Sequence, residues 1–201
     1  MTDGSIKQEI SMHQDDLKLF DMPARYAMKE HIATRHHFDL RLEYQGILIS
    51  FVLPDGPSLS PHNQMPAVHV EDHKVSRIYF EGIIRKGWPG AGPVSLWDRG
   101  CYRNITMHNG EPASMEQALQ RGYLEICLEG EKLRGGFSLR RVHSMKGEDW
   151  VFLKLQDEFA DETTDVVRVM PLSVKSRQTI EQIARGKKRP VMYSGQISFD
   201  L

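Results

Sequence analysis

Hydrophobic and polar residues alternate strictly from His37 to Glu43. This period of two is typical of a half-buried β-strand, whose successive side chains point to opposite faces. The apolar positions are Phe38, Leu40 and Leu42, and the polar positions are His37, Asp39, Arg41 and Glu43. One face of the predicted strand therefore packs against a core, and the other carries an imidazole, a carboxylate and a guanidinium in a row.

Short apolar or alternating runs recur along the rest of the chain, separated by turn residues such as Gln45-Gly46. They predict strands at 25–29, 37–43, 47–53, 67–73, 94–97, 123–128, 136–142 and 150–154. A turn is expected at Asp98–Gly100. Short helices are predicted at Ser114–Arg121 and Thr179–Ala184, each with a hydroxyl residue at its start. Many short strands at close intervals favour a mainly β fold, either an antiparallel barrel or a sandwich.

The same pattern divides the chain into three parts. Residues 1–24 are polar without a sustained period and are predicted to form a mobile arm, with a short helix near Asp15–Phe20. Residues 25–160 contain the predicted strands. Residues 161–201 form a C-terminal extension with one short helix and the basic run RGKKRP, which is either a solvated tail or a contact for nucleic acid.

Composition narrows the function classes. The 201-residue chain has a net charge of −1 and a pI near 6.8, which argues against bulk electrostatic binding of nucleic acid but leaves room for a local basic groove. Its 2 cysteines, Cys101 and Cys127, are too few for a disulfide framework. No apolar run approaches the roughly 20 residues of a membrane span, and no signal peptide is visible. We expect a cytoplasmic protein with no membrane contact.

The polar face of the 37–43 strand suggests a metal site. His37 and Asp39 stand two apart and can share one ion, and His31 lies upstream where a bend can bring it to the same ion. Mixed nitrogen and oxygen ligands suit Mn, Fe, Zn or Ni better than Mg or Ca. Arg41 is placed to bind an anion beside the metal. The alternative is that His37 and Asp39 form an ordinary surface pair.

A second titratable cluster lies in the predicted strand 67–73. Strict alternation puts His69, Glu71 and His73 on one face, with Val68 and Val70 on the other. If the two polar faces meet, the histidines join the metal site. His73 is then a further ligand, a donor to a phosphate oxygen or a general acid. The alternative is that His69 and His73 are partly exposed barrel residues.

Several stretches, in order, resemble the phosphoesterase domain of bacterial and archaeal DNA ligase D, here as a stand-alone chain. They are HIATRHHFDLRLEYQGILISFVLPDGPSL, VHVEDH, FEGIIRKGWPGAGPVSLWDRG and GEKLRGGFSLRRV…WVFLKLQDEFAD, and together they cover roughly 26–161. The resemblance implies a compact antiparallel β-barrel with flanking short helices. It also implies Mn²⁺-dependent healing of 3′ ends, in which a 3′-terminal ribonucleoside and then the 3′-phosphate are removed.

The resemblance also implies residue roles and partners. His31, His37 and Asp39 match the family's metal ligands, whereas Arg41 and His73 match residues that contact the phosphate and act in catalysis. The implied partners are 3′ ends of DNA or RNA-tailed DNA, together with a DNA ligase, a primase-polymerase or a Ku-like end-binding protein. His69 and Arg77 are added as candidate substrate-binding residues.

This sequence departs from the family pattern at two positions. Met65 stands where the family has an arginine before the VHVEDH strand, and Arg77 stands where it has a tyrosine after that strand. Arg77 is a candidate replacement for the missing cation. Because losing one charge-assisted contact to a developing phosphoryl charge can cost about a hundredfold in rate, we expect weakened activity, with the phosphomonoesterase step affected first.

Three hypotheses follow from these features. The first is a metal-dependent 3′-phosphoesterase of DNA repair and end joining. The second is a catalytically weakened homologue that binds 3′ ends or organises a repair complex. The third is a non-haem Fe(II) oxygenase, because H-x-D with a distant His is also the ligand pattern of that class.

Overall fold

The computed structural model describes residues 23–144 and 147–186 of the chain. Most of the predicted N-terminal arm, including the helix expected near Asp15–Phe20, lies outside the described residues. So does the larger part of the basic run RGKKRP. Within the described ranges, no helix is long and apolar enough to cross a membrane.

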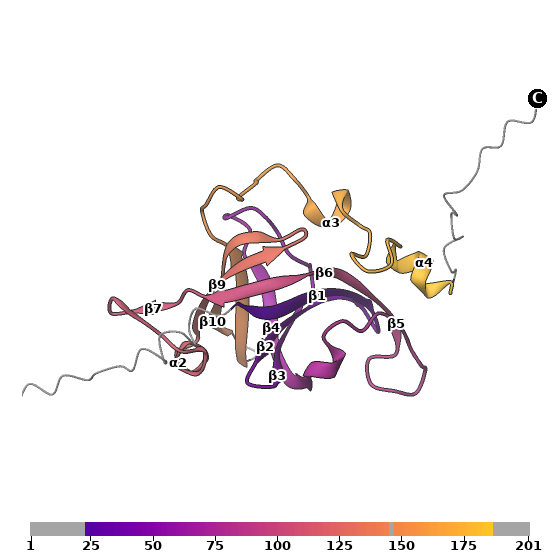
Figure 1. The fold of residues 1–201 in the computed structure, drawn as a ribbon, viewed down its shortest axis with the longest axis horizontal. Helices are drawn as coiled ribbons and strands as arrows, with labels where there is room; N and C mark the ends of the chain where they lie inside the picture. The colour runs from indigo at the N-terminus through magenta and orange to yellow at the C-terminus, as the bar shows by residue number, and fades with distance from the viewer. Residues whose placement is uncertain (1–22, 145–146, 187–201) are drawn as a thin grey trace, which may run out of the picture.

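The protein is built around a closed eight-stranded antiparallel barrel (Figure 1). Its strands are β1 (Ala24–Ile32), β2 (His36–Tyr44), β3 (Ile47–Leu53), β4 (Met65–Lys74), β11 (Gly147–Lys154), β10 (Arg134–Ser144), β9 (Tyr123–Gly130) and β6 (Gly92–Asn104), in spatial order. Pairing between β1 and β6 closes the barrel, and the short β5 (Gly82–Ile84) is added to the other side of β6. A separate two-stranded ribbon consists of β7 (Met107–His108) and β8 (Glu111–Pro112). The mainly β prediction is confirmed.

The two predicted helices that fall within the described residues are present and begin where their capping residues predict. In α2 (Met115–Arg121), the Ser114 hydroxyl accepts a hydrogen bond from the N–H of Gln117, and Gly122 ends the helix in the left-handed conformation. In α4 (Ile180–Ala184), Thr179 caps the helix in the same way. The structure adds α3 (Val166–Val169) and the 3₁₀ turn Val75–Arg77.

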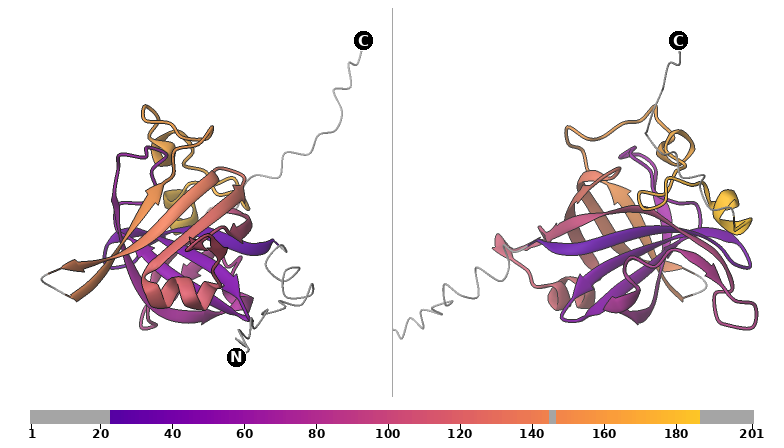
Figure 2. Two further views of the ribbon diagram at one scale, coloured as in Figure 1. Left: turned by 90° about the vertical axis from the view of Figure 1, so that its left-hand side faces the viewer. Right: turned by 45° about the vertical axis from the view of Figure 1, so that its right-hand side comes forward.

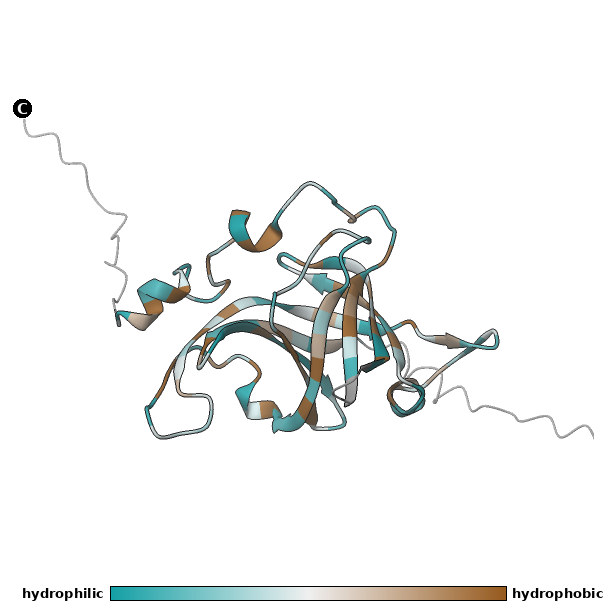
Figure 3. Cartoon of the chain, turned by 180° about the vertical axis from the view of Figure 1, so that it is seen from behind, coloured by the Kyte–Doolittle hydropathy of each residue, from teal (hydrophilic) through white to brown (hydrophobic). Residues whose placement is uncertain are grey.

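The barrel interior is filled by the apolar faces of the strands, visible as brown bands that alternate with teal in Figure 3. The inward residues of β2 are those that the alternation predicts, namely Phe38, Leu40 and Leu42. Trp97 is fully buried, and its ring meets that of Phe38 edge-on with 5.5 Å between the centroids.

A second, smaller apolar cluster lies on the outer side of the barrel wall. It joins Ala27, Leu48 and Leu96 of the strands to Ile78 and Val174. Backbone bonding holds the C-terminal extension here, because the N–H of Val174 donates to Leu96 O at 2.9 Å. The extension therefore covers part of the outer wall, on the side where Figures 1 and 2 show α3 and α4.

One local prediction is confirmed and one is wrong. A bend at 33–35 separates β1 from β2 and brings His31 opposite His37, as expected. The expected turn at Asp98–Gly100 lies inside β6, where the buried Asp98 accepts hydrogen bonds from Tyr26 Oη (2.6 Å) and from the N–H of Leu133 (2.9 Å). Gly100 is required by packing rather than by a turn, since a Cβ there would lie 2.1 Å from Glu129 O.

Candidate metal centre

Three predicted metal ligands meet on the outer face of the β1–β2 pair. The register places His31 opposite His37, and Asp39 is two residues further along β2. The carboxylate of Asp39 lies 3.6 Å from His31 Nδ1 and 3.8 Å from His37 Nε2. One ligand atom from each residue falls within 4.8 Å of the others, so the group can hold a metal ion. Among the described residues it is the one such cluster.

The two imidazoles are fixed by backbone carbonyls. His31 Nε2 lies 2.9 Å from Gly90 O, and His37 Nδ1 lies 3.0 Å from Arg35 O. A carbonyl only accepts, so these nitrogens carry the protons and the lone pairs lie on His31 Nδ1 and His37 Nε2, the two nitrogens nearest Asp39. Metal-binding histidines are oriented by this kind of carbonyl contact. The donor set therefore fits a divalent metal.

Arg41 extends the cluster along β2. Its guanidinium donates to Asp39 Oδ1 at 3.1 Å, and both side chains are buried. Burial alone would raise the pKa of Asp39, but its contact with His31 and the charge of Arg41 outweigh it and lower this pKa. Asp39 is therefore an anion at neutral pH, as a metal ligand must be.

His73 reaches the same face from β4. Its Nδ1 lies 2.8 Å from Glu71 O and 3.2 Å from Arg41 Nη1. The shorter contact, to an oxygen that can only accept, places a proton on Nδ1 and leaves Nε2 available to a ligand. Burial, followed by the charge of Arg41, lowers the pKa of His73. At neutral pH this histidine is neutral next to a fixed cation.

The predicted common face of His69 and His73 is wrong. The pairing of β3 with β4 shifts between Leu48 and Ser50, so that one extra residue of β4 bulges out ahead of His73. His69 consequently points to the core side, where its ring stacks on Phe51 with 4.8 Å between centroids. Its assignment as a substrate-binding residue stays a prediction, and the structure does not bring it to the metal face.

The two departures from the family pattern lie in different places. Met65 packs against the barrel core and stands opposite Phe152, on the same side of β4 as His69. Arg77 is exposed and ends the 3₁₀ turn that follows β4. Its backbone carbonyl accepts a hydrogen bond from Lys29 Nζ at 2.5 Å. The backbone of Arg77 is therefore bonded to a residue of the metal face, whereas Met65 lies on the other side of β4.

Lys29 is a buried cation that sequence reasoning missed. It stands opposite Asp39 in the β1–β2 register, and only 6% of the residue is exposed. Burial, and then the charge of Arg41, lowers the pKa of Lys29 to about 8. The available signal was its spacing, because Lys29 and His31 are two apart and so share a strand face.

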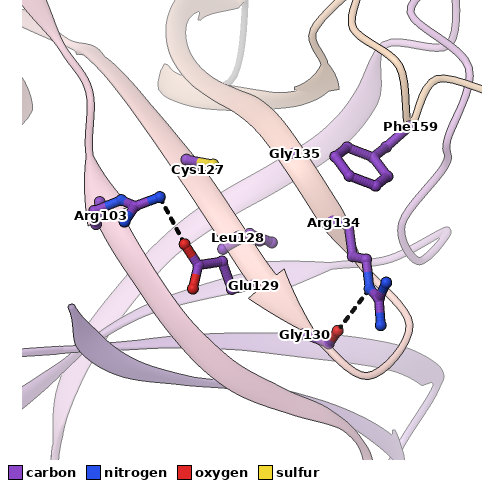
Figure 4. Close-up of a pocket in the computed structure, with 8 residues that line it drawn as sticks. All are labelled: Arg103, Cys127, Leu128, Glu129, Gly130, Arg134, Gly135 and Phe159. Atoms are coloured by element: carbon purple, nitrogen blue, oxygen red, sulfur yellow. Dashed lines mark hydrogen bonds and ion pairs between the residues drawn. The ribbon is translucent and has the colours of Figure 1, made fainter.

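Figure 4 shows a surface pocket that lies apart from the metal centre and shares no residue with it. It has a volume of about 410 Å³ and is lined by residues of β6, β9 and β10 together with Phe159. The Arg103–Glu129 ion pair, at 2.6 Å, lies on its wall with both side chains substantially exposed. None of its lining residues belongs to the metal cluster.

Comparison with known proteins identifies a family whose model matches this chain. The model of the DNA ligase D 3′-phosphoesterase domain matches residues 29–141, a range that contains all three residues of the metal cluster as well as Arg41 and His73.

Curated relatives match over a longer range. The multifunctional non-homologous end joining protein LigD of Pseudomonas aeruginosa is 38% identical over 159 residues, which are 78% of this chain and 18% of the relative. The protein of the same name from Mycolicibacterium smegmatis is 35% identical over 135 residues, 67% of this chain and 17% of the relative. The chain thus spans less than a fifth of the length of these relatives.

Proposed function

Because the chain belongs to the DNA ligase D 3′-phosphoesterase domain family, we propose that it is a metal-dependent hydrolase that heals nucleic-acid 3′ ends. The proposed reactions are removal of a 3′-terminal ribonucleoside and then of the 3′-phosphate, with Mn²⁺ as the preferred metal. The observation that carries the proposal is the cluster of His31, His37 and Asp39 with Arg41 bonded to its carboxylate.

Each residue has a distinct part in this proposal. A divalent ion in the cluster would polarise phosphoryl oxygens and lower the pKa of a bound water. Arg41 is held by Asp39 and presents its remaining N–H groups to a phosphate, a geometry that suits two-pronged binding. His73, with its Nδ1 proton occupied by Glu71 O, offers Nε2 to the same phosphate or to the leaving oxygen.

Lys29 and Arg77 supply further positive charge. Lys29 is buried beside Asp39 and holds the backbone carbonyl of Arg77, and the charged groups of both residues lie over the Phe80 ring. We propose Arg77 as a substrate-binding residue that contributes the charge Met65 does not. Because the phosphate monoester carries more negative charge than the diester, its cleavage depends more on these cations and is expected to be the weaker reaction.

The decisive experiment is incubation with Mn²⁺ and a primer-template that ends in a 3′-phosphate or a single 3′-ribonucleotide. We expect release of phosphate or nucleoside, loss of this release with chelator, and loss in Asp39→Ala. Glu129→Ala, at the exposed ion pair of Figure 4, is the matched control and should behave as wild type. Absence of both reactions with Mn²⁺, Mg²⁺, Zn²⁺ and Co²⁺ would contradict the proposal.

A second candidate is a binding module that retains end recognition without turnover. The departures at Met65 and Arg77 favour it, since both change residues that the family resemblance places at the phosphate. It predicts tighter binding of 3′-phosphorylated than of 3′-hydroxyl ends and no cleavage. Membership of the phosphoesterase family speaks against the Fe(II) oxygenase hypothesis.

The proposed partners follow from the relatives. The matching proteins are named as multifunctional end-joining proteins. We propose that the chain acts on DNA or RNA-tailed DNA ends beside a DNA ligase, a primase-polymerase or a Ku-like end-binding protein.

A further inference from the structure

The loop between β5 and β6 projects from the edge of the sheet beside the metal centre, at the right-hand end of the molecule in Figure 1. It runs from Arg85 to Ala91. Two turn hydrogen bonds shape it, from the N–H of Trp88 to Arg85 O (3.2 Å) and from the N–H of Ala91 to Trp88 O (3.1 Å). Apart from the Gly90 carbonyl that orients His31, nothing in the proposed chemistry uses this loop.

The loop is fastened directly to the metal centre. Gly90 O accepts the Nε2–H of His31 at 2.9 Å, and a Cβ on Gly90 would lie 3.3 Å from the His31 ring. Gly92 approaches β1 so closely that a Cβ there would lie 1.9 Å from Ile32 O. Trp88 is two residues before Gly90, so its Cα is within roughly 7 Å of the Gly90 Cα. The backbone of Trp88 therefore lies within two residues of the contact that orients His31.

The exposed side chains of the loop form an unusual set. Trp88 is 69% exposed, whereas the other tryptophans, Trp97 and Trp150, are buried. Arg85 and Lys86 precede it and are exposed as well. Exposing so much of a tryptophan has no benefit for folding, because burial of an aromatic ring is favourable. Cations beside an exposed aromatic ring are the combination that binds single-stranded or frayed nucleic acid, with phosphates on the cations and a base on the ring.

We propose that the β5–β6 loop is a nucleic-acid platform, on which Trp88 stacks against a base next to the 3′ end while Arg85 and Lys86 contact the backbone phosphates. The inference rests on the proposed function for the identity of the ligand. It extends that function by assigning the direction in which the bound nucleic-acid strand leaves the metal centre. The loop then acts as a specificity element that accepts any base, since every base has a face to stack.

The test uses the intrinsic fluorescence of the protein. Trp88 is the one exposed tryptophan of the 3 in the sequence, so quenching by DNA reports on this residue. A primer-template ending in a 3′-phosphate is titrated in chelator, which prevents turnover, and affinity is measured in parallel by anisotropy of labelled DNA. We expect saturable quenching at the concentrations where anisotropy rises.

Variants separate stacking from charge. Trp88→Ala should weaken binding by about five- to a hundredfold, and Trp88→Phe should restore most of the affinity without the fluorescence change. Arg85→Ala and Lys86→Ala should each lower the slope of log affinity against log salt by about one. Phe159→Ala, which removes an exposed aromatic ring from the hollow of Figure 4, is the matched control and should leave binding unchanged.

The outcomes distinguish this inference from the proposed function. Binding without quenching, unchanged affinity of Trp88→Ala, or no binding of DNA by the wild type each overturns the platform. If Trp88→Ala binds normally while the wild type releases phosphate with Mn²⁺, the platform fails and the proposed function stands. If DNA quenches Trp88 but no metal supports release, the platform stands and the proposed function fails.

Discussion

The two outer faces of this barrel use charge in opposite ways. On the β1–β2 face, Lys29, His31, Asp39 and Arg41 are all buried. On the face of β6, β9 and β10, the side chains of Arg103 and Glu129 are 42% and 51% exposed. Both faces carry ion pairs of good length, 3.1 Å for Arg41–Asp39 and 2.6 Å for Arg103–Glu129. The difference lies in solvent access and not in contact geometry.

This difference in burial distinguishes charged groups that form a functional site from charged groups that are ordinary surface residues. Taking charges out of water costs several kcal/mol per ion, so a buried cluster is weak evidence for stability and good evidence for a site. An exposed pair costs little and contributes about 0–1 kcal/mol. Length of an ion pair is therefore a poor guide to function, whereas burial of several titratable groups together is a useful one.

Burial of the β1–β2 face is achieved by segments distant in sequence. Ile78 and Val174 pack on Ala27 and Leu96 beside the charged row. Glu81 ties these segments together, because its carboxylate accepts hydrogen bonds from Ser173 Oγ and from the N–H of Leu96. The C-terminal extension therefore contributes to the cover of the metal face.

The largest effect is expected from removing Asp39. In Asp39→Ala the buried Arg41 loses its carboxylate, so the metal-free protein should lose about 3–5 kcal/mol of unfolding free energy. Divalent-metal binding should vanish with it. Urea denaturation and calorimetric titration with Mn²⁺ measure the two effects. Retained metal stoichiometry in both Asp39→Ala and the size-matched Asp39→Asn would show that the cluster is not the metal centre.

The next largest effect concerns the guanidinium of Arg41. Arg41→Lys keeps the charge but not the two-pronged donor, so phosphate release should fall by about a hundredfold or more. Metal affinity should stay within a few-fold of wild type, because Arg41 is not a ligand. The measurement is single-turnover release at saturating Mn²⁺. A variant with full activity would mean that Arg41 serves only to neutralise Asp39.

A smaller, split effect is expected for the two histidines of β4. His73→Ala should lower the release rate by about tenfold to a thousandfold, in line with loss of a general acid or a phosphate contact, with little change in stability. His69→Ala should instead lower stability by about 0.5–1.5 kcal/mol through loss of stacking on Phe51, without changing the rate. Equal losses of release rate in the two variants would contradict the conclusion that the bulge places His69 and His73 on different faces of β4.

Local signals account for much of the fold. The alternation of β2 gives its inward and outward faces, and Ser114 with Gly122 marks both ends of α2. The same alternation places Asp39 and Arg41 on one face, and the structure adds His31 by cross-strand pairing with His37. The side-chain period of a strand and the capping of a helix depend on residues close together in sequence, so they can be predicted without knowing the tertiary fold.

What could not be predicted depends on long-range geometry. The extra residue that bulges out of β4 ahead of His73 moves the side chains that follow it to the other face of the strand. No neighbouring residue in the sequence predicts this bulge. Lys29 looks like a surface residue until the β1–β2 register places it beside Asp39. Val174 packs near Ala27 although the two are 147 residues apart in sequence (174 − 27), and no local pattern indicates where the extension will pack.

The smallest effect is expected on the face formed by β6, β9 and β10. In a double-mutant cycle of Arg103→Ala and Glu129→Ala, the coupling free energy should be only about 0.2–1 kcal/mol, because both side chains remain in solvent and pay conformational entropy to meet. The coupling should shrink further at 1 M salt, where the Debye length is about 3 Å. Phosphate release should not change in any of the three variants. A coupling of several kcal/mol, or a loss of activity, would show that the hollow of Figure 4 is energetically linked to the metal face, and the contrast between buried and exposed charge would no longer identify the site.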